Sequence, residues 1–257
     1  MGMLFSYDQI AKLNKGEFRV YNYTVLHMSE VSEMNIRELA AKANVSTTTV
    51  LRFCSKMGCD GYTEFRYKLK KAFAEDSADI SSSLSTSSAI QFLENSMGNQ
   101  ELSNKLEQAA ELCLQADRVM FIGCGTSGCL AEYGAHFFAS AGVSSYAMTD
   151  MYYPLPETDM TEVVLFVLSV SGETSSLISQ MTGYQKRGAK IISITNNDCC
   201  TAANMSQINF SYYMPQIYAV QESRIRTTLT TQIPVIYLLE TLTRKLSEIE
   251  NANKKRD

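Results

Sequence analysis

Two short apolar runs, each followed by a turn rich in glycine or hydroxyl residues, constrain the fold of this chain more than any other feature. Residues Val119–Ile122 lead into Gly123–Gly128, and residues Val163–Leu168 lead into Ser169–Thr174. Short apolar runs bounded by turn signals are typical of strands that are buried on both faces. Helical patterns separate these runs, and such alternation predicts a parallel sheet of the α/β class.

The same alternation continues along the chain from residue 89 onward. We expect five strands, at residues 119–122, 144–148, 163–168, 190–195 and 208–212. We expect helices at about residues 101–116, 126–141, 174–187 and 231–251, the last with Pro234 in its first turns. Ligands bind at the carboxyl ends of parallel strands in open sheets of this class, so the two turns above form the candidate site.

Composition restricts the protein to an ordinary globular class. The chain has 257 residues, of which 45% are apolar and 19% charged, and this length allows one or two domains. No apolar run approaches the roughly 20 residues needed to cross a membrane, and residues 1–7 lack a signal-peptide pattern, so we expect a cytoplasmic location and no membrane partner. With seven cysteines, no C-x-x-C pair and two histidines, we expect reduced core thiols, no metal site and no cofactor.

Charge and serine content divide the chain into two parts. Residues 1–75 hold 11 Lys and Arg against 8 Asp and Glu, a net charge of +3, and the remainder carries −7. A basic front and an acidic body suit a nucleic-acid-binding head on a separate domain. Seven of the twelve residues at 77–88 are serine, which is typical of a flexible linker. We therefore expect an all-α domain at residues 1–76, a linker at 77–88 and an α/β domain at 89–257.

The part before the serine segment has helical patterns throughout, with a helix-turn-helix at its centre. Helices are expected at residues 17–28, 36–43, 47–57 and 62–73. Between the two central helices, Asn44 suits a left-handed turn and Ser46 suits an N-cap. Small or apolar residues stand where the two helices of such a motif pack: Leu39, Ala40, Ala43, Val45, Val50 and Phe53. The alternative is a pair of packed helices in an unrelated bundle.

The outer side of the second helix carries groups that suit DNA. Hydroxyl and guanidinium groups contact phosphates and base edges in a major groove. The candidate DNA-binding residues are Ser46, Thr47, Thr48, Thr49, Arg52 and Lys56. Other cations suit either the phosphate backbone or a solvated helix face: Lys42, Arg66, Lys68, Lys70 and Lys71.

The two turns after the apolar strands suit a phosphate monoester. Each precedes a helix, whose N-terminal N–H groups and positive dipole end attract anions. Glycines let a ligand approach the backbone and hydroxyls add donors, so this chemistry needs no metal. The first turn has the G-x-G-x-x-G spacing of a dinucleotide fingerprint, but no acidic residue ends the strand that follows, so nicotinamide binding is not favoured.

Both parts of the chain resemble known families. The stretch VSTTTVLRFCSKMGCDGYTEFRYKL resembles the helix-turn-helix signature of the MurR/RpiR family of bacterial transcription regulators. Residues from about 89 onward resemble the SIS (sugar isomerase) domain, which implies a flavodoxin-like sheet of five parallel strands flanked by helices. In SIS domains the matching hydroxyls hold the phosphate of a sugar. The resemblance implies sugar-phosphate-binding residues Gly125, Thr126, Ser127, Ser169, Ser171 and Thr174, with Glu222 where SIS enzymes often carry a functional glutamate.

The resemblance implies a transcription regulator of a sugar uptake or breakdown operon, controlled by a sugar phosphate and without catalytic residues. One helix-turn-helix covers a half-site of the operator DNA, so we expect a homodimer or homotetramer. The alternative is a sugar-phosphate aldose–ketose isomerase with an accessory helical domain, which needs a base to move a proton. The candidate bases are Glu222 and His136. A sugar-phosphate sensor that does not bind DNA is a third interpretation.

Overall fold

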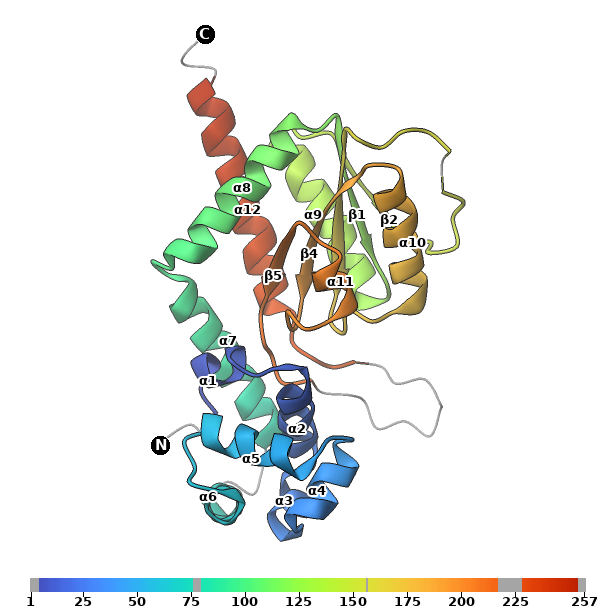
Figure 1. Cartoon of the computed structure of the whole chain (residues 1–257). Coiled ribbons are helices and arrows are strands. Elements are labelled where there is room, and N and C mark those ends of the chain that lie inside the picture. The colour runs from blue at the N-terminus through green and yellow to red at the C-terminus, as the bar shows by residue number, and fades with distance from the viewer. Residues whose placement is uncertain (1–4, 76–79, 156, 217–227, 254–257) are drawn as a thin grey trace. The chain divides into compact units, whose positions relative to one another are not determined.

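The computed structural model describes residues 5–75, 80–155, 157–216 and 228–253 (Figure 1). The chain forms two compact units, which we call the helical unit and the sheet unit. The helical unit combines Met1–Glu94 with Tyr213–Thr231, and the sheet unit combines Asn95–Tyr212 with Gln232–Asp257. Among the described residues, no helix is both long enough and apolar enough to span a membrane.

The helical unit packs short helices around aromatic side chains. Its first helices are α1 (Tyr7–Ala11), α2 (Lys15–Leu26), α3 (Met28–Glu33), α4 (Ile36–Lys42), α5 (Thr47–Lys56) and α6 (Tyr62–Glu75). Phe53 and Phe65 meet edge to face with ring centroids 5.3 Å apart, and Phe5 meets Tyr21 in the same way at 5.3 Å. These rings are almost inaccessible to solvent, and burying one phenylalanine stabilises a fold by about 1.5–3 kcal/mol. The four expected helices are confirmed.

Side-chain caps explain where these helices begin. Three of them open with a capping box, in which the cap residue and the residue three positions on each bond the other's backbone N–H: Ser6 with Gln9, Asn14 with Glu17, and Asn35 with Glu38. Each box satisfies two N–H groups that lack a partner within the helix. The sequence does not predict α1 and α3, because helices of 5 and 6 residues are too short to show an apolar period.

The sheet unit contains five parallel strands in the order β2-β1-β3-β4-β5. The strands are β1 (Arg118–Gly123), β2 (Ser145–Met148), β3 (Val163–Ser169), β4 (Lys190–Thr195) and β5 (Ile208–Ser211). Every residue of the central strand β3 is buried, as the apolar run predicts. This is the strand order of flavodoxin-like sheets, so the expected fold class is confirmed.

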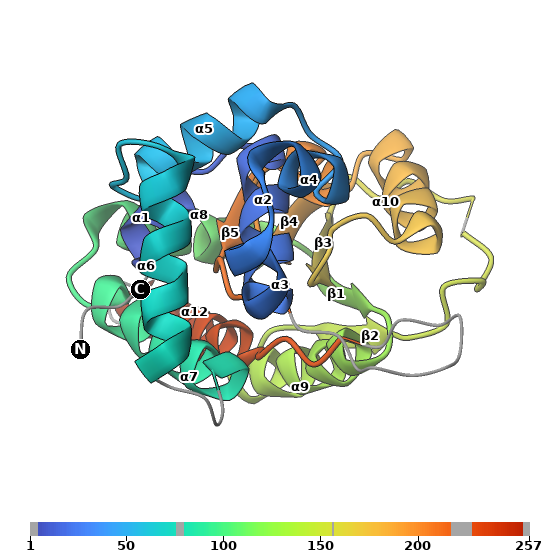
Figure 2. The ribbon, with the colours of Figure 1, turned by 90° about the horizontal axis from the view of Figure 1, so that it is seen from below.

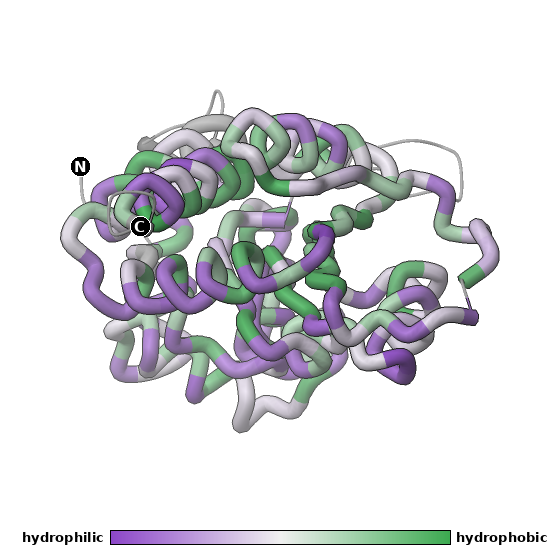
Figure 3. Tube along the Cα trace, turned by 90° about the horizontal axis from the view of Figure 1, so that it is seen from above, coloured by the Kyte–Doolittle hydropathy of each residue, from purple (hydrophilic) through white to green (hydrophobic). Residues whose placement is uncertain are grey.

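Helices cover both faces of this sheet. They are α8 (Gln100–Gln115), α9 (Thr126–Ser140), α10 (Ser175–Lys186), α11 (Thr201–Asn204) and α12 (Ile233–Asn253). Helices α8, α9 and α12 pack together on one face, and α10 and α11 lie on the other (Figures 1 and 2). The central strands β1, β3 and β4 are buried at nearly every position, whereas hydrophilic and hydrophobic residues alternate along the coils of the trace (Figure 3). Pro234 lies in the first turn of α12 and marks its start rather than a kink.

The serine-rich segment is helical, so the expectation of a flexible linker is wrong for the described residues 80–88. Helix α7 runs from Ile80 to Ser96 without a break. Ser88, Ala89 and Phe92 on this helix are buried. Serine costs a helix less than about 0.7 kcal/mol relative to alanine, so burial of a few side chains outweighs the composition. The boundary between the two compact units falls inside this helix, between Glu94 and Asn95.

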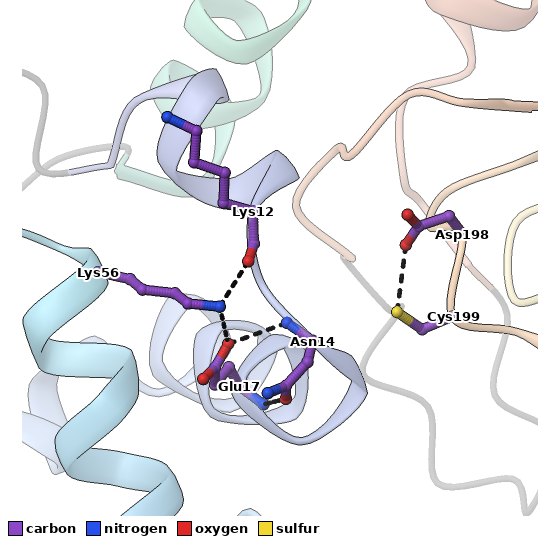
Figure 4. Close-up of polar contacts among 6 residues, drawn as sticks. All are labelled: Lys12, Asn14, Glu17, Lys56, Asp198 and Cys199. Carbon is purple, nitrogen blue, oxygen red and sulfur yellow. Dashed lines mark hydrogen bonds and ion pairs between the residues drawn. The ribbon is translucent and has the colours of Figure 1, made fainter.

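A buried carboxylate joins α5 to α2 (Figure 4). Lys56 Nζ, at the end of α5, lies 2.6 Å from Glu17 Oε2 and donates another hydrogen bond to the Lys12 carbonyl at 2.6 Å. Glu17 Oε2 also accepts the Asn14 N–H at 2.9 Å. The Glu17 side chain is 2% exposed, whereas that of Lys56 is 37% exposed. The buried carboxylate therefore depends on Lys56 for its charged partner.

We expect Lys56→Met to destabilise the helical unit by about 1–3 kcal/mol, because the variant leaves the Glu17 carboxylate buried without its charged donor. Hydrogen–deuterium exchange of the α2 and α5 amides measures this loss. The control is Lys68→Met: Lys68 Nζ lies 2.8 Å from a carboxylate of Glu64, whose side chain is 38% exposed. Removing that exposed pair should cost less than about 1 kcal/mol. Equal effects of the two substitutions would contradict the role given to Lys56.

Candidate functional site

The helix-turn-helix has the turn and the cap that its sequence predicts. Asn44 has a φ of 53°, the left-handed conformation expected at the turn. Ser46 is the N-cap of α5, and its Oγ accepts the Thr49 N–H at 3.2 Å. Half-buried Val45 packs against the core of the unit. The other residues expected to pack are buried: Leu39, Ala40, Ala43, Val50 and Phe53.

The outer face of α5 carries fewer available groups than the sequence suggests. Thr48 and Arg52 are exposed, and Thr47 is half-buried. Thr49 faces α2 instead, because its methyl carbon would lie 3.1 Å from a Cβ placed on Gly16. Its hydroxyl shares a hydrogen bond of 2.9 Å with the hydroxyl of the N-cap. Thr47, Thr48 and Arg52 are therefore the α5 side chains best placed for an outside partner.

Contacts within the helical unit occupy most of the cations considered for a DNA backbone. Those with intramolecular partners are Lys56, Arg66, Lys68 and Lys70. Within the described ranges, the side chains of Lys42, Arg52 and Lys71 form no ion pair or hydrogen bond, and the same holds for Arg37 of α4. All four are exposed. These four, which we call the open cations, are the charges that α4, α5 and α6 leave available to a polyanion.

The two predicted loops leave the sheet side by side. Strands β1 and β3 pair in parallel with Gly123 opposite Leu168, so their carboxyl ends are adjacent at the usual strand spacing of about 4.8 Å. The chain then passes to α9 on one face and to α10 on the other (Figure 2). This divergence is the switch point at which open α/β sheets bind ligands. The structure therefore brings residues 123–128 and 169–174 to one edge of the sheet, where the sequence predicts them.

Glycine allows the first loop to turn tightly into α9. A Cβ on Gly123 would lie 2.5 Å from the Ser127 carbonyl oxygen, closer than real Cβ contacts allow. Gly125 has φ 58° and ψ −128°, a conformation that side chains disfavour. No atom outside the loop lies within 4 Å of the Cβ position of Gly125. Helix α9 starts without a side-chain cap, so its first N–H groups remain available to an anion.

Backbone N–H groups orient the hydroxyls of the second loop. Ser169 Oγ accepts a hydrogen bond from the Gly172 N–H at 3.0 Å. Ser171 Oγ accepts one from the Glu173 N–H at 3.2 Å. A serine hydroxyl has one proton and two lone pairs, so both serines keep a proton for a further acceptor. Thr174 begins α10 without using its side chain as a cap. Three hydroxyl donors thus gather on one short turn.

Two residues of this site are not predicted from the sequence. Gln232 directly precedes α12; its Oε1 accepts a hydrogen bond from Ser127 Oγ at 3.2 Å, and its Nε2 donates one to Thr126 Oγ1 at 2.8 Å. The carboxylate of Glu173 accepts from the N–H and the hydroxyl of Thr201, at 3.2 and 2.7 Å. No motif marks either residue, because their partners lie 105 and 28 positions away in the chain.

The remaining candidates have less to contribute. Glu222, expected beside the sugar, lies outside the described residues. His136 is exposed on α9. All seven cysteines are free thiols and four of them are buried; half-buried Cys199 donates to Asp198 at 3.1 Å (Figure 4). In the part of the chain that the structure describes, His, Cys, Asp and Glu side chains form no group of three suited to a metal ion.

Comparison with known families covers both units. Residues 7–76 match the family described as the helix-turn-helix domain of the rpiR family. Residues 113–241, half of the chain, match the SIS domain. The first match includes α4 and α5, and the second includes both loops and Gln232.

Relatives of known name match the chain over different lengths. The HTH-type transcriptional regulator HexR of Pseudomonas aeruginosa is 24% identical over 248 residues, which cover 91% of this chain and 85% of HexR. The bifunctional protein glk of Burkholderia thailandensis is 27% identical over 203 residues, which cover 72% of this chain and 31% of that protein. The chain thus spans about a third of the length of the glk proteins that it matches.

Solved structures share the fold. The Vibrio vulnificus NanR protein complexed with ManNAc-6P has a TM-score of 0.55 and 22% identity, and the match covers 95% of this chain and 90% of NanR. A Methanococcus jannaschii protein, for which a function as 3-hexulose-6-phosphate isomerase is inferred, has a TM-score of 0.52 and 19% identity, and the match covers 66% of this chain and 90% of that protein. The NanR match thus extends over nearly the whole chain, and the other over two thirds of it.

Proposed function

The chain belongs to the rpiR family of helix-turn-helix proteins and carries a SIS domain, and on that premise we propose that it is a DNA-binding transcription regulator controlled by a sugar phosphate. One observation carries the proposal. A single chain combines an exposed second helix of a helix-turn-helix with a turn of hydroxyl donors at the switch point of a parallel sheet. The genes it controls serve uptake or breakdown of the sugar that it senses.

The helical unit supplies the DNA-binding half of this function. Arg52, Thr47 and Thr48 of α5 enter the major groove and contact base edges. The open cations contact phosphates, which account for about half to two-thirds of the hydrogen bonds in such interfaces. Ser46 and Thr49 lie at the start of the same helix and contribute through the loop backbone that they order. We do not include Lys56 among the DNA contacts, because its ammonium group bonds the Glu17 carboxylate of α2.

The sheet unit supplies the effector site. The phosphate is held by the hydroxyls of Ser127, Ser169, Ser171 and Thr174 and by N–H groups of both helix starts, with Gly125 and Thr126 along its path. Glu222 bonds a hydroxyl of the sugar. The ManNAc-6P bound to NanR, which shares this fold, supports a sugar phosphate as the class of ligand.

An isomerase is the second candidate, because a structural relative is described in those terms. Isomerisation needs a base beside the C1–C2 bond of the sugar. Two observations weigh against this activity: His136 is exposed on α9, and the Glu173 carboxylate is held by Thr201. We therefore propose no catalytic residue.

Thermal unfolding of the full chain tests the effector class. The probes are ManNAc-6P, glucose 6-phosphate, fructose 6-phosphate and inorganic phosphate, with glucose and fructose as controls. A ligand that binds the native state raises the unfolding temperature by mass action, so phosphorylated probes should raise it and parent sugars should not. Conversion of a probe, followed by NMR, would favour the isomerase. No shift with any phosphorylated probe would contradict the proposed site.

We expect Ser171→Ala to weaken phosphosugar binding by about 10- to 150-fold, because it removes a hydrogen bond to a charged group worth about 1.5–3 kcal/mol. Ser171 suits this test better than Ser169, whose Oγ holds a buried N–H of its own loop. The control is Ser179→Ala, an exposed serine farther along α10. Calorimetric titration measures both affinities, and DNA binding should be unchanged in each. Equal affinities would remove Ser171 from the site.

The DNA probe is a duplex that the wild-type protein selects from a random pool. We expect Arg52→Ala to weaken binding to this duplex by about 1–3 kcal/mol, because the variant loses a base contact. The loss should be smaller for a duplex of scrambled sequence. The control is Arg118→Ala, which removes the same charge from the sheet unit and should leave affinity unchanged. Gel-shift titration at fixed salt measures the affinities of wild type and both variants for the two duplexes. Parallel losses on both duplexes would show a phosphate contact instead of base recognition.

We also propose a homodimer or homotetramer, because one helix-turn-helix reads only a half-site and two are needed for useful affinity. Light scattering of the full chain at micromolar concentration measures the assembly. The expected mass is two or four times that of the chain, and the mass of a single chain would contradict this proposal.

A further inference from the structure

Gln232 bridges two hydroxyls of the phosphate site. Its Oε1 accepts a hydrogen bond from Ser127 Oγ at 3.2 Å, and its Nε2 donates one to Thr126 Oγ1 at 2.8 Å. Ser127 is 5% exposed, so water has little access to its hydroxyl. The backbone carbonyl of Gln232 accepts the Val235 N–H at the start of α12. Gln232 therefore links the first loop to α12.

The Gln232 amide and a phosphate compete for the same proton. A hydroxyl has one proton, and Ser127 donates it to Gln232 Oε1. A phosphate oxygen is also an acceptor, so it obtains the Ser127 proton only when the amide releases it. Turning the amide over exchanges the roles of Thr126 and Ser127, yet one hydroxyl proton is still committed to Oε1.

The chain that leads into Gln232 belongs to the helical unit. The chain leaves the sheet unit after Tyr212 and returns at Gln232. Tyr213, at the start of this excursion, packs against the core of the helical unit, and Asn22 of α2 donates to Gln216 at 3.1 Å. Gln232 is thus the residue at which the chain returns from the unit that carries the helix-turn-helix to the sheet unit.

We infer that Gln232 is the residue through which the phosphate site signals to the DNA-binding unit. While the amide holds the two hydroxyls, the start of α12 is fixed to the first loop. A phosphate that takes the Ser127 proton releases the amide and with it the tie between the first loop and the start of α12. The inference rests on the proposed function, since it takes a phosphate monoester as the ligand and DNA binding as the response. Gln232 is a positioning residue, not a phosphate ligand.

The Gln232→Leu variant separates signalling from binding. Leucine is similar in size but offers no donor or acceptor, so both hydroxyls are available to the phosphate from the start. We expect phosphosugars to bind about 2- to 10-fold more tightly, the equivalent of one net hydrogen bond. In wild type, phosphosugars should change the affinity for DNA by about 5- to 150-fold. In Gln232→Leu we expect this effect to be almost absent. Gln232→Glu, which adds a negative charge, should weaken phosphosugar binding by about tenfold or more.

Calorimetric titration of the full chain measures both quantities. The probes are ManNAc-6P, glucose 6-phosphate, fructose 6-phosphate and inorganic phosphate, each with and without the selected DNA duplex. The control is Gln185→Leu, also in the sheet unit. It loses one hydrogen bond, which the Gln185 side-chain amide donates to the Met205 carbonyl at 3.2 Å. It should keep the wild-type affinity and the wild-type effect on DNA binding.

Each outcome decides the matter. An unchanged effect on DNA binding in Gln232→Leu overturns the inference. Weaker phosphosugar binding in this variant would make Gln232 a direct ligand and overturns it equally. If Gln232→Leu does not fold, wild-type phosphosugar affinity in Gln232→Glu overturns it. A wild-type chain that binds none of the four probes contradicts the proposed function itself.

Discussion

The parallel pairing of β1 with β3 is the constraint on which the sheet unit depends. These strands are adjacent in the sheet but not consecutive, because the chain after β1 passes through α9 and β2 before it enters β3. The helices that follow the two strands, α9 and α10, lie on opposite faces of the sheet. Neither helix can cover the ends of both strands. The edge is therefore left open, and both loops reach it with their helix N-termini directed there. Gly123 is needed because the first loop returns so closely that a Cβ would meet the Ser127 carbonyl.

Local patterns predict the fold well where burial decides it. The apolar run at Val163–Leu168 matches a strand that is buried at every position, and Asn44 and Ser46 mark the turn and cap of the helix-turn-helix. Composition fails at residues 80–88, because it does not show which faces of a helix are buried. Helix α7 forms there although serine is a weak helix former.

The candidate site is predictable only in its loops. The sequence shows that hydroxyls follow two strands, but the partner of Gln232 lies 105 positions away. Lys56 is a similar case, since its carboxylate partner Glu17 lies 39 positions away. A lysine on the outer side of a helix has the same local pattern whether its ammonium group contacts solvent, DNA or a buried carboxylate. Only the packing of α2 against α5 distinguishes these possibilities.

Serine serves the two loops in chemically different ways. Ser169 and Ser171 accept bonds from their own backbone, so their protons remain available whatever the rest of the unit does. Ser127 donates to a side chain from another element, so its proton is available only when that side chain moves. The second loop is therefore a fixed part of the proposed phosphate site, and the first loop takes part only when Gln232 moves. In such a site the second loop binds the ligand, and the movement of Gln232 that binding requires at the first loop transmits the binding event.

The charges of the helical unit explain why a small structural change can control DNA binding. Of the cations on α4, α5 and α6, the four open cations are the ones available to phosphates, because the others on these helices are held by partners within the unit. If each neutralises one phosphate, the slope of log affinity against log salt is about −3.6 per head, at about −0.9 per phosphate. A single head with so few contacts binds weakly at physiological salt. Tight binding then requires two heads at the correct spacing, so the geometry of the proposed dimer or tetramer would set the affinity for DNA.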